Sequence, residues 1–474
     1  MFIMKKIVSL ILASVMLLSA FSVVSFASEK ATDSFAILSE AMSAETFKAS
    51  NGTELPYRLY VPTNYDAEKE YSFLIFLHGA GNVGSDNARQ IKEHTKLLER
   101  IVAGETFEYD GKTYNAGEEF IVIAPQCASG SQWVNADWSI HPDPSYKLEE
   151  MPISEHNTAV VELIDYMKKN YSLNPERMYA TGLSMGGFGI WDLLMRYPDM
   201  FAAAVPMGGA GDPTKAHIIK ETPVWTFHQM HDPLVAPNGT VAMVKALVEA
   251  GAEVRFTPYF DTEHNAWRRG YAEPDMFTWF YSHTKNENTV AYSDKIATEG
   301  ASNWAKGEIA LAYAADIMPE GLVGKYRENI TRKEFCQMVV NILPKDLKAR
   351  RVAKFKDCDD AAVKYAYSVG VINGLNDSTF APDAPATRQE IATMLYRAFM
   401  LIAPDAKSEF KGSSPDRAKI ADWALAAVDF LNENEVMKGD DKGNINPLAN
   451  TTCEEATLLA WRAFCEASYY GKGE

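Results

Sequence analysis

The sequence has little cysteine, no surplus of positive charge and a single long apolar stretch, at its start. Its five cysteines are odd in number and irregularly spaced, which does not describe a disulfide framework. Cys453 and Cys465 fall about three turns apart in one predicted helix, or about 18 Å along its axis, beyond the reach of a disulfide. We therefore expect mostly buried thiols, and a bridge between Cys336 and Cys358 is an open alternative.

Acidic residues outnumber basic ones. The chain has 63 Asp and Glu against 46 Lys and Arg, a formal net charge of −17. This charge argues against nucleic acid and anionic membrane surfaces as partners. An acidic polymer would have to be bound through a few placed basic side chains. With 47% hydrophobic and 23% charged residues, the composition is that of globular domains, and 474 residues indicate two or three of them.

Residues 1–27 have the features of a secretory signal peptide. A lysine pair precedes the apolar run 7–18, and residues 25–27 form a small-x-small cleavage site. An uncleaved anchor is the alternative, because residues 7–27 are nearly long enough to span a bilayer. Serines recur through this run and favour cleavage. No other stretch is apolar enough to cross a membrane, so we expect export without a membrane anchor.

The motif Gly182-Leu183-Ser184-Met185-Gly186 is the most informative feature of the chain. The pattern predicts a short buried strand at residues 177–181 and an amphipathic helix at residues 187–195. A serine on the sharp turn between strand and helix projects its hydroxyl above a sheet, and flanking glycines allow that turn without a Cβ clash. Ser184 is therefore the candidate nucleophile. The alternative is a glycine-rich packing turn with an idle serine.

An acid and a base follow in the chain order that such hydrolases use. The strand-like residues 223–228 lead to Asp232, and the strand-like residues 253–260 lead to the loop that carries His264. A serine hydroxyl is a poor nucleophile until an imidazole takes its proton, and a buried carboxylate then fixes the imidazole tautomer. We predict that His264 serves Ser184 in this way and that Asp232 orients His264.

Other interpretations of these residues stay open. Asp212 follows the strand-like residues 202–207 and is a rival acid, but Asp232 is favoured because it lies one strand before the histidine. Asp232 could also merely cap a helix. His228 and His231 could bind a metal, but no clear third ligand is nearby, so a structural role is favoured. Neither a metal nor an organic cofactor is predicted.

The apolar strand predicted at residues 71–77 ends in the small-residue turn His78-Gly79-Ala80-Gly81. Such a turn aims a backbone N–H at a developing oxyanion, and the residue after the nucleophile supplies the second donor. We therefore predict an oxyanion hole formed by the N–H groups of Ala80 and Met185.

A long loop is expected between residues 125 and 155. It carries Trp133, Trp138, His141 and Tyr146. Loops of this length are usually functional or disordered. Its rings could form a platform for an acyl group or a sugar beside Ser184, or could anchor the loop to the domain. Trp133 and Gln126 are the candidate substrate contacts.

Together these motifs resemble those of the α/β-hydrolases. They lie at residues 77–81, 124–127, 182–187, 231–233 and 264–267. The branch resembled is that of secreted esterases and predicted peptidases related to feruloyl and polyhydroxybutyrate esterases. The resemblance covers about residues 45–285 and implies an α/β fold, a mostly parallel sheet flanked by helices. Asn82-Val83-Gly84 departs from the family's Glu-Arg-Gly-like stretch, which leaves contacts near the oxyanion loop open.

The resemblance implies a serine carboxylesterase at residues 28–285 that acts on feruloyl, acetyl or related esters of polysaccharides. Two alternatives stay open. One is a serine peptidase of the prolyl-oligopeptidase type, against which the lack of a gating propeller weighs. The other is a wall-binding structural protein with a degenerate hydrolase domain, against which the set of Ser184, Asp232 and His264 weighs.

Beyond a polar linker at residues 285–288, the sequence is rich in helix signals and repetitive. Thr331-Arg332-Lys333-Glu334 is echoed by Thr387-Arg388-Gln389-Glu390 and, more weakly, by Thr452-Cys453-Glu454-Glu455. A threonine followed by this glutamate is a helix capping box. A further helix is predicted before each box, at residues 304–317, 361–369 and 423–431. The period indicates three copies of a two-helix unit that bury their apolar faces together.

These copies resemble S-layer homology modules, the non-covalent anchors of Gram-positive-type cell walls. The resemblance implies an all-α module of three repeats, at residues 286–345, 346–405 and 406–474, that binds a secondary, often pyruvylated, wall polysaccharide at the cell surface. Arg332 and Arg388 match the ligand-binding position, where a guanidinium fork suits a carboxylate. The third repeat has Cys453 there, which implies weak or absent binding. Alternatively, both arginines only pair with neighbouring glutamates.

Overall fold

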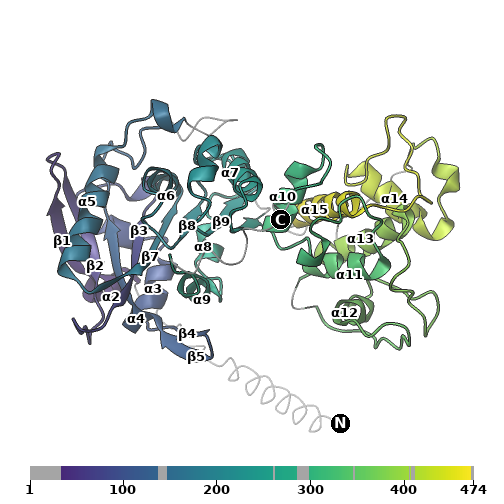
Figure 1. Cartoon of the computed structure of the whole chain (residues 1–474), viewed down its shortest axis with the longest axis horizontal. Helices are drawn as coiled ribbons and strands as arrows, with labels where there is room; N and C mark the ends of the chain where they lie inside the picture. Colours follow the sequence, from purple (N-terminus) through teal and green to yellow (C-terminus); the bar gives the residue numbers. More distant parts are fainter. Residues whose placement is uncertain are drawn as a thin grey trace, which may run out of the picture.

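The computed structural model describes residues 34–136, 147–259, 262–285, 298–344, 347–404, 406 and 412–470. The predicted signal peptide, Trp138, His141, Tyr146 and most of the predicted linker lie outside these ranges. Figure 1 shows two parts: a sheet with helices on both faces, and an assembly of helices formed by the later residues.

The first part is built on an eight-stranded sheet with the order β1-β2-β6-β3-β7-β8-β9-β10. Its strands are β1 (Ser43–Lys48), β2 (Glu54–Tyr60), β3 (Tyr71–Leu77), β6 (Phe120–Pro125), β7 (Leu173–Leu183), β8 (Ala203–Met207), β9 (Val224–Gln229) and β10 (Val254–Tyr259). β2 pairs antiparallel with both β1 and β6, and the other pairs in the sheet are parallel. β4 (Thr106–Tyr109) and β5 (Lys112–Asn115) form a separate hairpin. The predicted mostly parallel sheet is confirmed.

The central strands are apolar along their whole length because both faces of the sheet are covered. Every residue of β3, β6 and β9 is buried. One face is covered by α5 (Glu155–Asn170), α6 (Met185–Arg196) and α7 (Asn238–Glu249), and Phe73 and Ile75 of β3 point into that core. The other face is covered by α2 (Ser34–Ala41), α3 (Lys96–Val102) and α9 (Met276–Tyr281), and Leu74 and Phe76 point there. Two short helices, α4 (Ala116–Glu119) and α8 (Trp267–Gly270), complete this part.

The elements agree with the sequence patterns to within a few residues. β3 coincides with the strand predicted at residues 71–77, and a turn at Asn51-Gly52 joins β1 to β2. The strand predicted at residues 177–181 is longer, since β7 runs from Leu173 to Leu183. α6 begins at Met185 rather than at residue 187. The amino end of α6 therefore follows Ser184 directly.

The regular elements described in the second part are helices joined by loops. Its main helices are α10 (Lys306–Ala314), α11 (Arg332–Asn341), α12 (Ala361–Val369), α13 (Arg388–Ile402), α14 (Asp422–Glu433) and α15 (Cys453–Tyr470). The segments that lead into α11, α13 and α15 form a closed ring of backbone hydrogen bonds. Ile330 N–H donates to Thr451 O (2.9 Å), Thr451 N–H to Ala386 O (3.0 Å) and Ala386 N–H to Ile330 O (2.9 Å). The three segments are equivalent in this ring.

Capping boxes begin these helices, as the sequence predicts. Thr331 and Glu334 form one at α11, and Thr387 and Glu390 form one at α13. At α15, Glu455 N–H donates to Thr452 Oγ1 (3.3 Å) and Glu455 Oε2 accepts from Thr452 N–H (2.9 Å). Each box satisfies backbone N–H groups that the first helical turn leaves without partners.

The two parts pack against each other through α10. Figure 1 shows α10 between α7 and α15, and α10 contacts both of these helices and β10. Arg255 Nε, on the sheet side, lies 3.6 Å from a carboxylate oxygen of Asp316. Arg462 of α15 pairs with Glu308 of α10 at 2.6 Å. Buried apolar side chains of both parts form one continuous core. A cut between the two parts would therefore expose apolar surface on α7.

All five cysteines are free thiols, so the alternative of a Cys336–Cys358 bridge is not realised. Cys453 and Cys465 both lie in α15, as predicted. Within the described ranges, no helix has the length and apolar character needed to cross a bilayer.

Candidate functional site

Ser184 occupies a sharp turn between β7 and α6. Its backbone has φ 53° and ψ −121°, a conformation that residues with a side chain rarely adopt. The turn is packed so closely that a Cβ at Gly182 would lie 2.5 Å from Gly186 O, and one at Gly186 would lie 2.1 Å from Leu77 O. The two glycines of the motif are therefore required by packing as well as by the turn.

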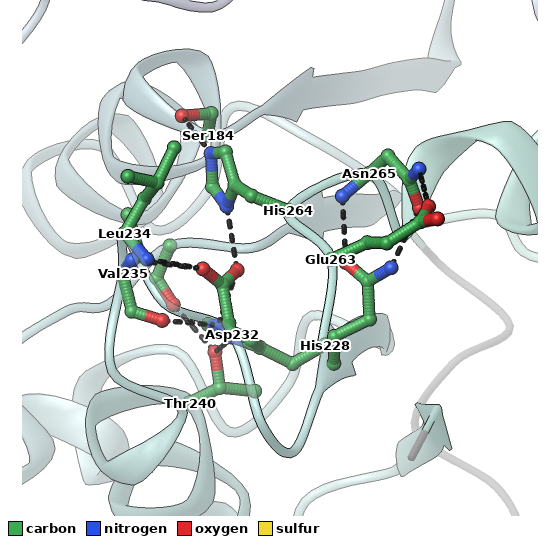
Figure 2. Close-up of polar contacts among 11 residues, drawn as sticks. Ser184, His228, Asp232, Leu234, Val235, Thr240, Glu263, His264 and Asn265 are labelled. Carbon is green, nitrogen blue, oxygen red and sulfur yellow. Dashed lines mark hydrogen bonds and ion pairs between the residues drawn. The ribbon is translucent and has the colours of Figure 1, made fainter. Parts of the chain in front are cut away.

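The structure brings Ser184, His264 and Asp232 together (Figure 2). His264 Nε2 lies 2.8 Å from Ser184 Oγ, and His264 Nδ1 lies 2.5 Å from Asp232 Oδ2. Ser184 follows β7, Asp232 follows β9 and His264 follows β10, so all three lie at the carboxyl edge of the parallel strands. The parallel sheet thus places residues that are distant in sequence side by side.

Asp232 is buried and held as an anion. Its Oδ1 accepts hydrogen bonds from the N–H groups of Leu234 (2.8 Å) and Val235 (2.9 Å). Burial works to raise the pKa of Asp232, but the nearby imidazole of His228 and the hydrogen bonds from His264 and from Val235 N–H outweigh it and hold that pKa well below its usual range. The carboxylate is therefore ionised at neutral pH.

Asp212, the rival acid, has different partners. It is completely buried, and its carboxylate accepts from Leu148 N–H (3.0 Å), Thr214 N–H (3.0 Å) and the Thr214 hydroxyl (2.6 Å). Lys147 lies 3.8 Å away. These contacts tie the loop before α5 to the end of β8. The structure therefore brings Asp232, rather than Asp212, to His264.

The turn after β3 lies against the serine. A Cβ at Gly79 would be 3.5 Å from Ser184 Cβ, and Ala80 begins a short helical turn, Ala80–Asn82. Met185 is the first residue of α6, and its N–H belongs to the positive end of the helix dipole. The two N–H groups predicted to bind an oxyanion thus come from segments that flank Ser184.

His78 holds this turn in place, a role that the sequence analysis missed. Its side chain is buried; Nδ1 lies 2.7 Å from Gly79 O, and Nε2 accepts from Cys127 N–H over 3.0 Å. Burial lowers the pKa of His78 to about 4. The imidazole is therefore neutral, with its proton on Nδ1 and donated to Gly79. The sequence signal for this role is a histidine in the turn that ends an apolar strand.

Trp133 and Gln126, the predicted substrate contacts, are completely buried and cannot reach a substrate. Trp133 Nε1–H donates to His78 O (3.0 Å). The Gln126 amide donates to Asp86 (2.8 Å) and accepts from Asn87 N–H (2.7 Å). Both residues therefore anchor loops around the site, because their polar atoms are used internally.

The segment Asn82-Val83-Gly84, where the sequence departs from the family pattern, packs on the same amide. A Cβ at Gly84 would lie 2.9 Å from Gln126 Nε2, and Gln126 Nε2 lies 3.3 Å from Asn82 O. The contacts of this segment near the oxyanion turn are therefore partly known. Its residues and Gln126 hold each other beside the oxyanion turn.

A cleft of about 610 Å³ opens beside His264, and the sequence analysis missed it. It is lined by Glu93, His94, Lys96, Glu99, Trp267 and Arg268. The ring of Trp267 packs edge-on against His264 (4.9 Å between centroids) and against His94 (5.3 Å). The lining comes from α3, the loop before it and α8, which no motif connects in sequence.

In the helical part, Arg332 and Arg388 each lie in a groove. Arg332 shares a groove of about 340 Å³ with Asn373, Glu390, Arg397 and Trp423. Arg388 shares a groove of about 450 Å³ with Lys438, Glu455, Arg462 and Trp304. The two tryptophans are among the most exposed large apolar side chains described, at 58% for Trp423 and 62% for Trp304.

Both arginines pair with neighbouring glutamates, as the alternative prediction has it. Arg332 Nη1 lies 2.6 Å from Glu390 Oε1, and Arg388 Nη1 lies 3.4 Å from Glu455 Oε1. Each Nε–H also donates to a carbonyl, of Phe380 for Arg332 and of Ile445 for Arg388. These contacts fix each guanidinium in the wall of its groove.

The third equivalent position lacks these groups. Cys453 stands in place of the arginine, and Lys325 pairs with the capping Glu334 at 3.1 Å. Asn341 stands where α13 and α15 have Arg397 and Arg462. Each exposed tryptophan precedes, by the same number of residues, a positive-φ residue that ends its helix. Cys358 precedes Gly370 by that number too, so it occupies the position of the tryptophan. Arginine and tryptophan are thus replaced together.

Comparison with known proteins assigns both parts. Residues 49–270 match the family described as "Putative esterase", and residues 358–392 and 415–457 match the S-layer homology domain. The chain carries an esterase-family domain followed by S-layer homology domains.

Individual relatives divide in the same way. Poly(3-hydroxyalkanoate) depolymerase C of Paucimonas lemoignei is 43% identical over 51 residues, 11% of this chain and 12% of that protein. The surface-layer 125 kDa protein of Lysinibacillus sphaericus is 29% identical over 168 residues, 33% of this chain and 14% of that protein. A solved thermostable esterase is 31% identical with a TM-score of 0.46, over 52% of this chain and 64% of its own. The chain spans only 11% to 15% of the length of the first curated relatives it matches.

Proposed function

We propose that this chain is a serine carboxylesterase held at the cell surface. The observation that carries the proposal is the hydrogen-bonded series from Ser184 through His264 to Asp232. An imidazole between a hydroxyl and a buried, ionised carboxylate is the arrangement that activates serine as a nucleophile. The match of residues 49–270 to an esterase family supports the same chemistry.

In the proposed mechanism, Ser184 Oγ attacks the ester carbonyl carbon while His264 Nε2 takes the hydroxyl proton. Asp232 stabilises the resulting imidazolium. The carbonyl oxygen becomes an oxyanion, for which the N–H groups of Ala80 and Met185 are the proposed donors. When the intermediate collapses, the bond to the alcohol oxygen breaks and His264 returns the proton to that oxygen.

Water then releases the acyl group by the same steps. His264 takes a proton from water, the oxygen attacks the acyl carbon, and the bond to Ser184 Oγ breaks as Oγ regains a proton from His264. The carboxylic acid leaves and the free serine is restored. Every proton in this cycle is carried by His264.

We propose esters borne by polysaccharides, feruloyl or acetyl, as the substrates. The leaving alcohol must lie on the side of His264, because this residue gives it a proton. The cleft beside His264 is lined by the partly exposed ring of His94, by the largely buried Trp267 and by charged groups such as Arg268 and Glu99. Rings combined with hydrogen-bonding groups suit a sugar that carries both apolar faces and hydroxyls.

We propose that the helical part is a module of three S-layer homology repeats that binds an acidic wall polysaccharide. The S-layer homology matches and the equivalence of the three segments in the backbone ring support this proposal. Each arginine groove offers a fixed guanidinium for a carboxylate and an exposed tryptophan for a sugar face. Export through a signal peptide at residues 1–27 is part of the same proposal.

The test of the esterase proposal is turnover of a chromogenic short-chain ester by the full chain, with Ser184→Ala in the same assay. Loss of the nucleophile should reduce kcat by about 10⁴–10⁶-fold. Ser378→Ala, on an exposed loop of the helical part, is the matched control and should keep full activity. A Ser184→Ala variant with more than a tenth of the wild-type rate would remove the nucleophile assignment. Cleavage of peptides in preference to esters would replace esterase by peptidase.

A further inference from the structure

His228 is a second histidine beside Asp232, and the proposed mechanism does not use it. It lies near the carboxyl end of β9 and is completely buried. Figure 2 shows it with Thr240 and Val235 next to the Asp232 carboxylate. A buried polar ring in such a place has a reason that its hydrogen bonds should reveal.

The hydrogen-bond partners of His228 fix one of its protons. Nε2 lies 3.0 Å from Val235 O and 3.6 Å from Asp232 Oδ2. A carbonyl and an ionised carboxylate only accept hydrogen bonds, so Nε2 must carry a proton. Nδ1 lies 2.7 Å from Thr240 Oγ1, whose hydroxyl is 2.5 Å from Gly209 O. The Thr240 hydroxyl donates to that carbonyl, and the need for a proton at Nε2 does not depend on the contact at Nδ1.

This N–H reaches both ends of the loop that carries the acid. Asp232 Oδ1 accepts from the N–H of Val235, and His228 binds the carbonyl of that same Val235. Asp232 Oδ2, the oxygen that faces His228, is also the one that receives Nδ1–H of His264. His228 therefore constrains the loop and the oxygen on which the orientation of His264 depends.

We propose that His228 is a positioning residue for the esterase reaction: its Nε2–H fixes the Asp232 carboxylate in the place from which it orients His264. The inference rests on the proposed esterase function and adds a residue to it. His228 has no contact with Ser184 and takes no proton from the substrate. It acts only through Asp232, with Thr240 and the Gly209 carbonyl setting its ring.

Two measurable consequences follow from this placement. Without the Nε2 donor the carboxylate is less firmly aimed at His264, which lowers kcat because misplaced catalytic groups lose rate steeply. The same N–H also directs positive charge at Asp232 Oδ2. Without it that oxygen favours the imidazolium form of His264 more strongly, so the base is blocked up to a higher pH.

The surroundings make this pH effect specific. Among the described titratable side chains, those within 4 Å of the Asp232 carboxylate are His228 from β9 and His264 from the loop after β10. The residue of α7 that contacts the His228 ring, Thr240, is neutral. On its other side His264 packs on Trp267, beyond which His94 lies, and neither residue changes in the variants below.

The test compares His228→Asn with His228→Gln in the full chain. The glutamine amide reaches about as far as Nε2, whereas the shorter asparagine amide reaches only as far as Nδ1. We expect His228→Asn to lower kcat about tenfold or more with KM nearly unchanged, and to move the acidic limb of kcat/KM upward by about half a pH unit. His228→Gln should recover most of the wild-type kcat and return the acidic limb of kcat/KM to its wild-type position. His217→Gln, at an exposed site, is the control.

The outcomes separate this inference from the proposed function. An inactive wild type removes the esterase proposal itself. An active wild type with an unaffected His228→Asn variant, or with both variants equally slow and the limb unmoved, overturns the role of His228. If His228→Asn does not fold, nitrogen-15 spectra of histidine-labelled wild type decide, with His228→Gln giving the assignment. Nε2 of His228 should carry a proton under the assay conditions, and an unprotonated Nε2 would exclude the proposal.

Discussion

The two candidate sites of this chain are built in opposite ways. Around Ser184, side chains far apart in sequence meet at one edge of a sheet, and buried hydrogen bonds fix them in one arrangement. In the helical part, one short motif recurs, and each groove takes its arginine, its tryptophan and its glutamate from different copies. The first site depends on each of its three side chains. The second site consists of equivalent grooves, one of which lacks the arginine and the tryptophan. Mutations should therefore act all-or-none at the first site and in steps at the second.

The sharpest test of the first half of this comparison separates the two buried aspartates. Asp232→Asn leaves the shape of the site but presents an amide to His264, which then holds the wrong tautomer, at a cost of about 10⁴-fold in kcat. Asp212→Asn, equally buried but bonded to Leu148 and Thr214, should cost less than tenfold. Steady-state kinetics on a chromogenic ester checks the ranking. The reverse ranking would transfer the role of the acid to Asp212.

For the helical part, the comparison predicts that wall binding is lost in steps. Each arginine–carboxylate contact is worth about 1.5–3 kcal/mol, so Arg332→Ala or Arg388→Ala alone should weaken binding to purified cell-wall sacculi about 10–150-fold. The double variant should no longer sediment with them. Its esterase activity should be unchanged, because neither arginine contacts the sheet domain in the described structure.

The design of that experiment follows from the packing of α10. Separating the parts would uncover apolar surface on α7, so the full chain is the material to use. Arg350→Ala, at an exposed site, is a matched control that should bind normally. Undiminished sedimentation of the double variant would show that these arginines only pair with glutamates.

A third prediction concerns acid stability and the oxyanion turn. Burial lowers the pKa of His78 to about 4 from an ordinary value near 6.5, so the unfolded chain binds a proton that the folded chain refuses. Stability from this residue is complete above pH 6.5 and is lost as the pH falls toward 4, by about 3 kcal/mol. Thermal denaturation across this range should show a shallower decline for His78→Gln than for wild type. Parallel declines would mean that other groups carry the acid sensitivity.

The catalytic candidates could be predicted because their signals are local. Ser184 could be predicted from the neighbouring glycines that its turn requires, and His264 from a strand that is followed by a loop. The mostly parallel sheet was implied by the resemblance that these motifs carry. The capping boxes were equally local, since each depends on a threonine and a glutamate one helical turn apart.

What the sequence concealed depends on contacts between distant segments. The sequence allowed Trp133 to be either a substrate platform or an anchor of its loop, and its hydrogen bond to His78 inside the protein favours the anchor. No spacing in the chain links His94 to Trp267, so the cleft beside His264 had no sequence signal. The packing of α10 against α7 was hidden for the same reason, because an apolar helix face does not name its partner.

The smallest effect is expected at Cys453, where the comparison between the grooves is most direct. Its backbone N–H donates to Glu328 O, just as the N–H groups of Arg332 and Arg388 donate to Ala384 O and Ala449 O, so the three positions have equivalent backbone contacts. Its side chain is buried, and Lys325 already neutralises Glu334. Cys453→Ala removes one buried sulfur, so it should lower stability by no more than about 1–2 kcal/mol and leave sedimentation with sacculi unchanged. Cys358 and Asn341 also replace the tryptophan and the second arginine of this groove. We therefore expect that the Cys453 thiol contributes nothing to binding of the wall polymer. Sacculi binding measured on Cys453→Ala beside Arg388→Ala decides the point, and a comparable loss in both variants would mean that the third groove binds the polymer through other groups.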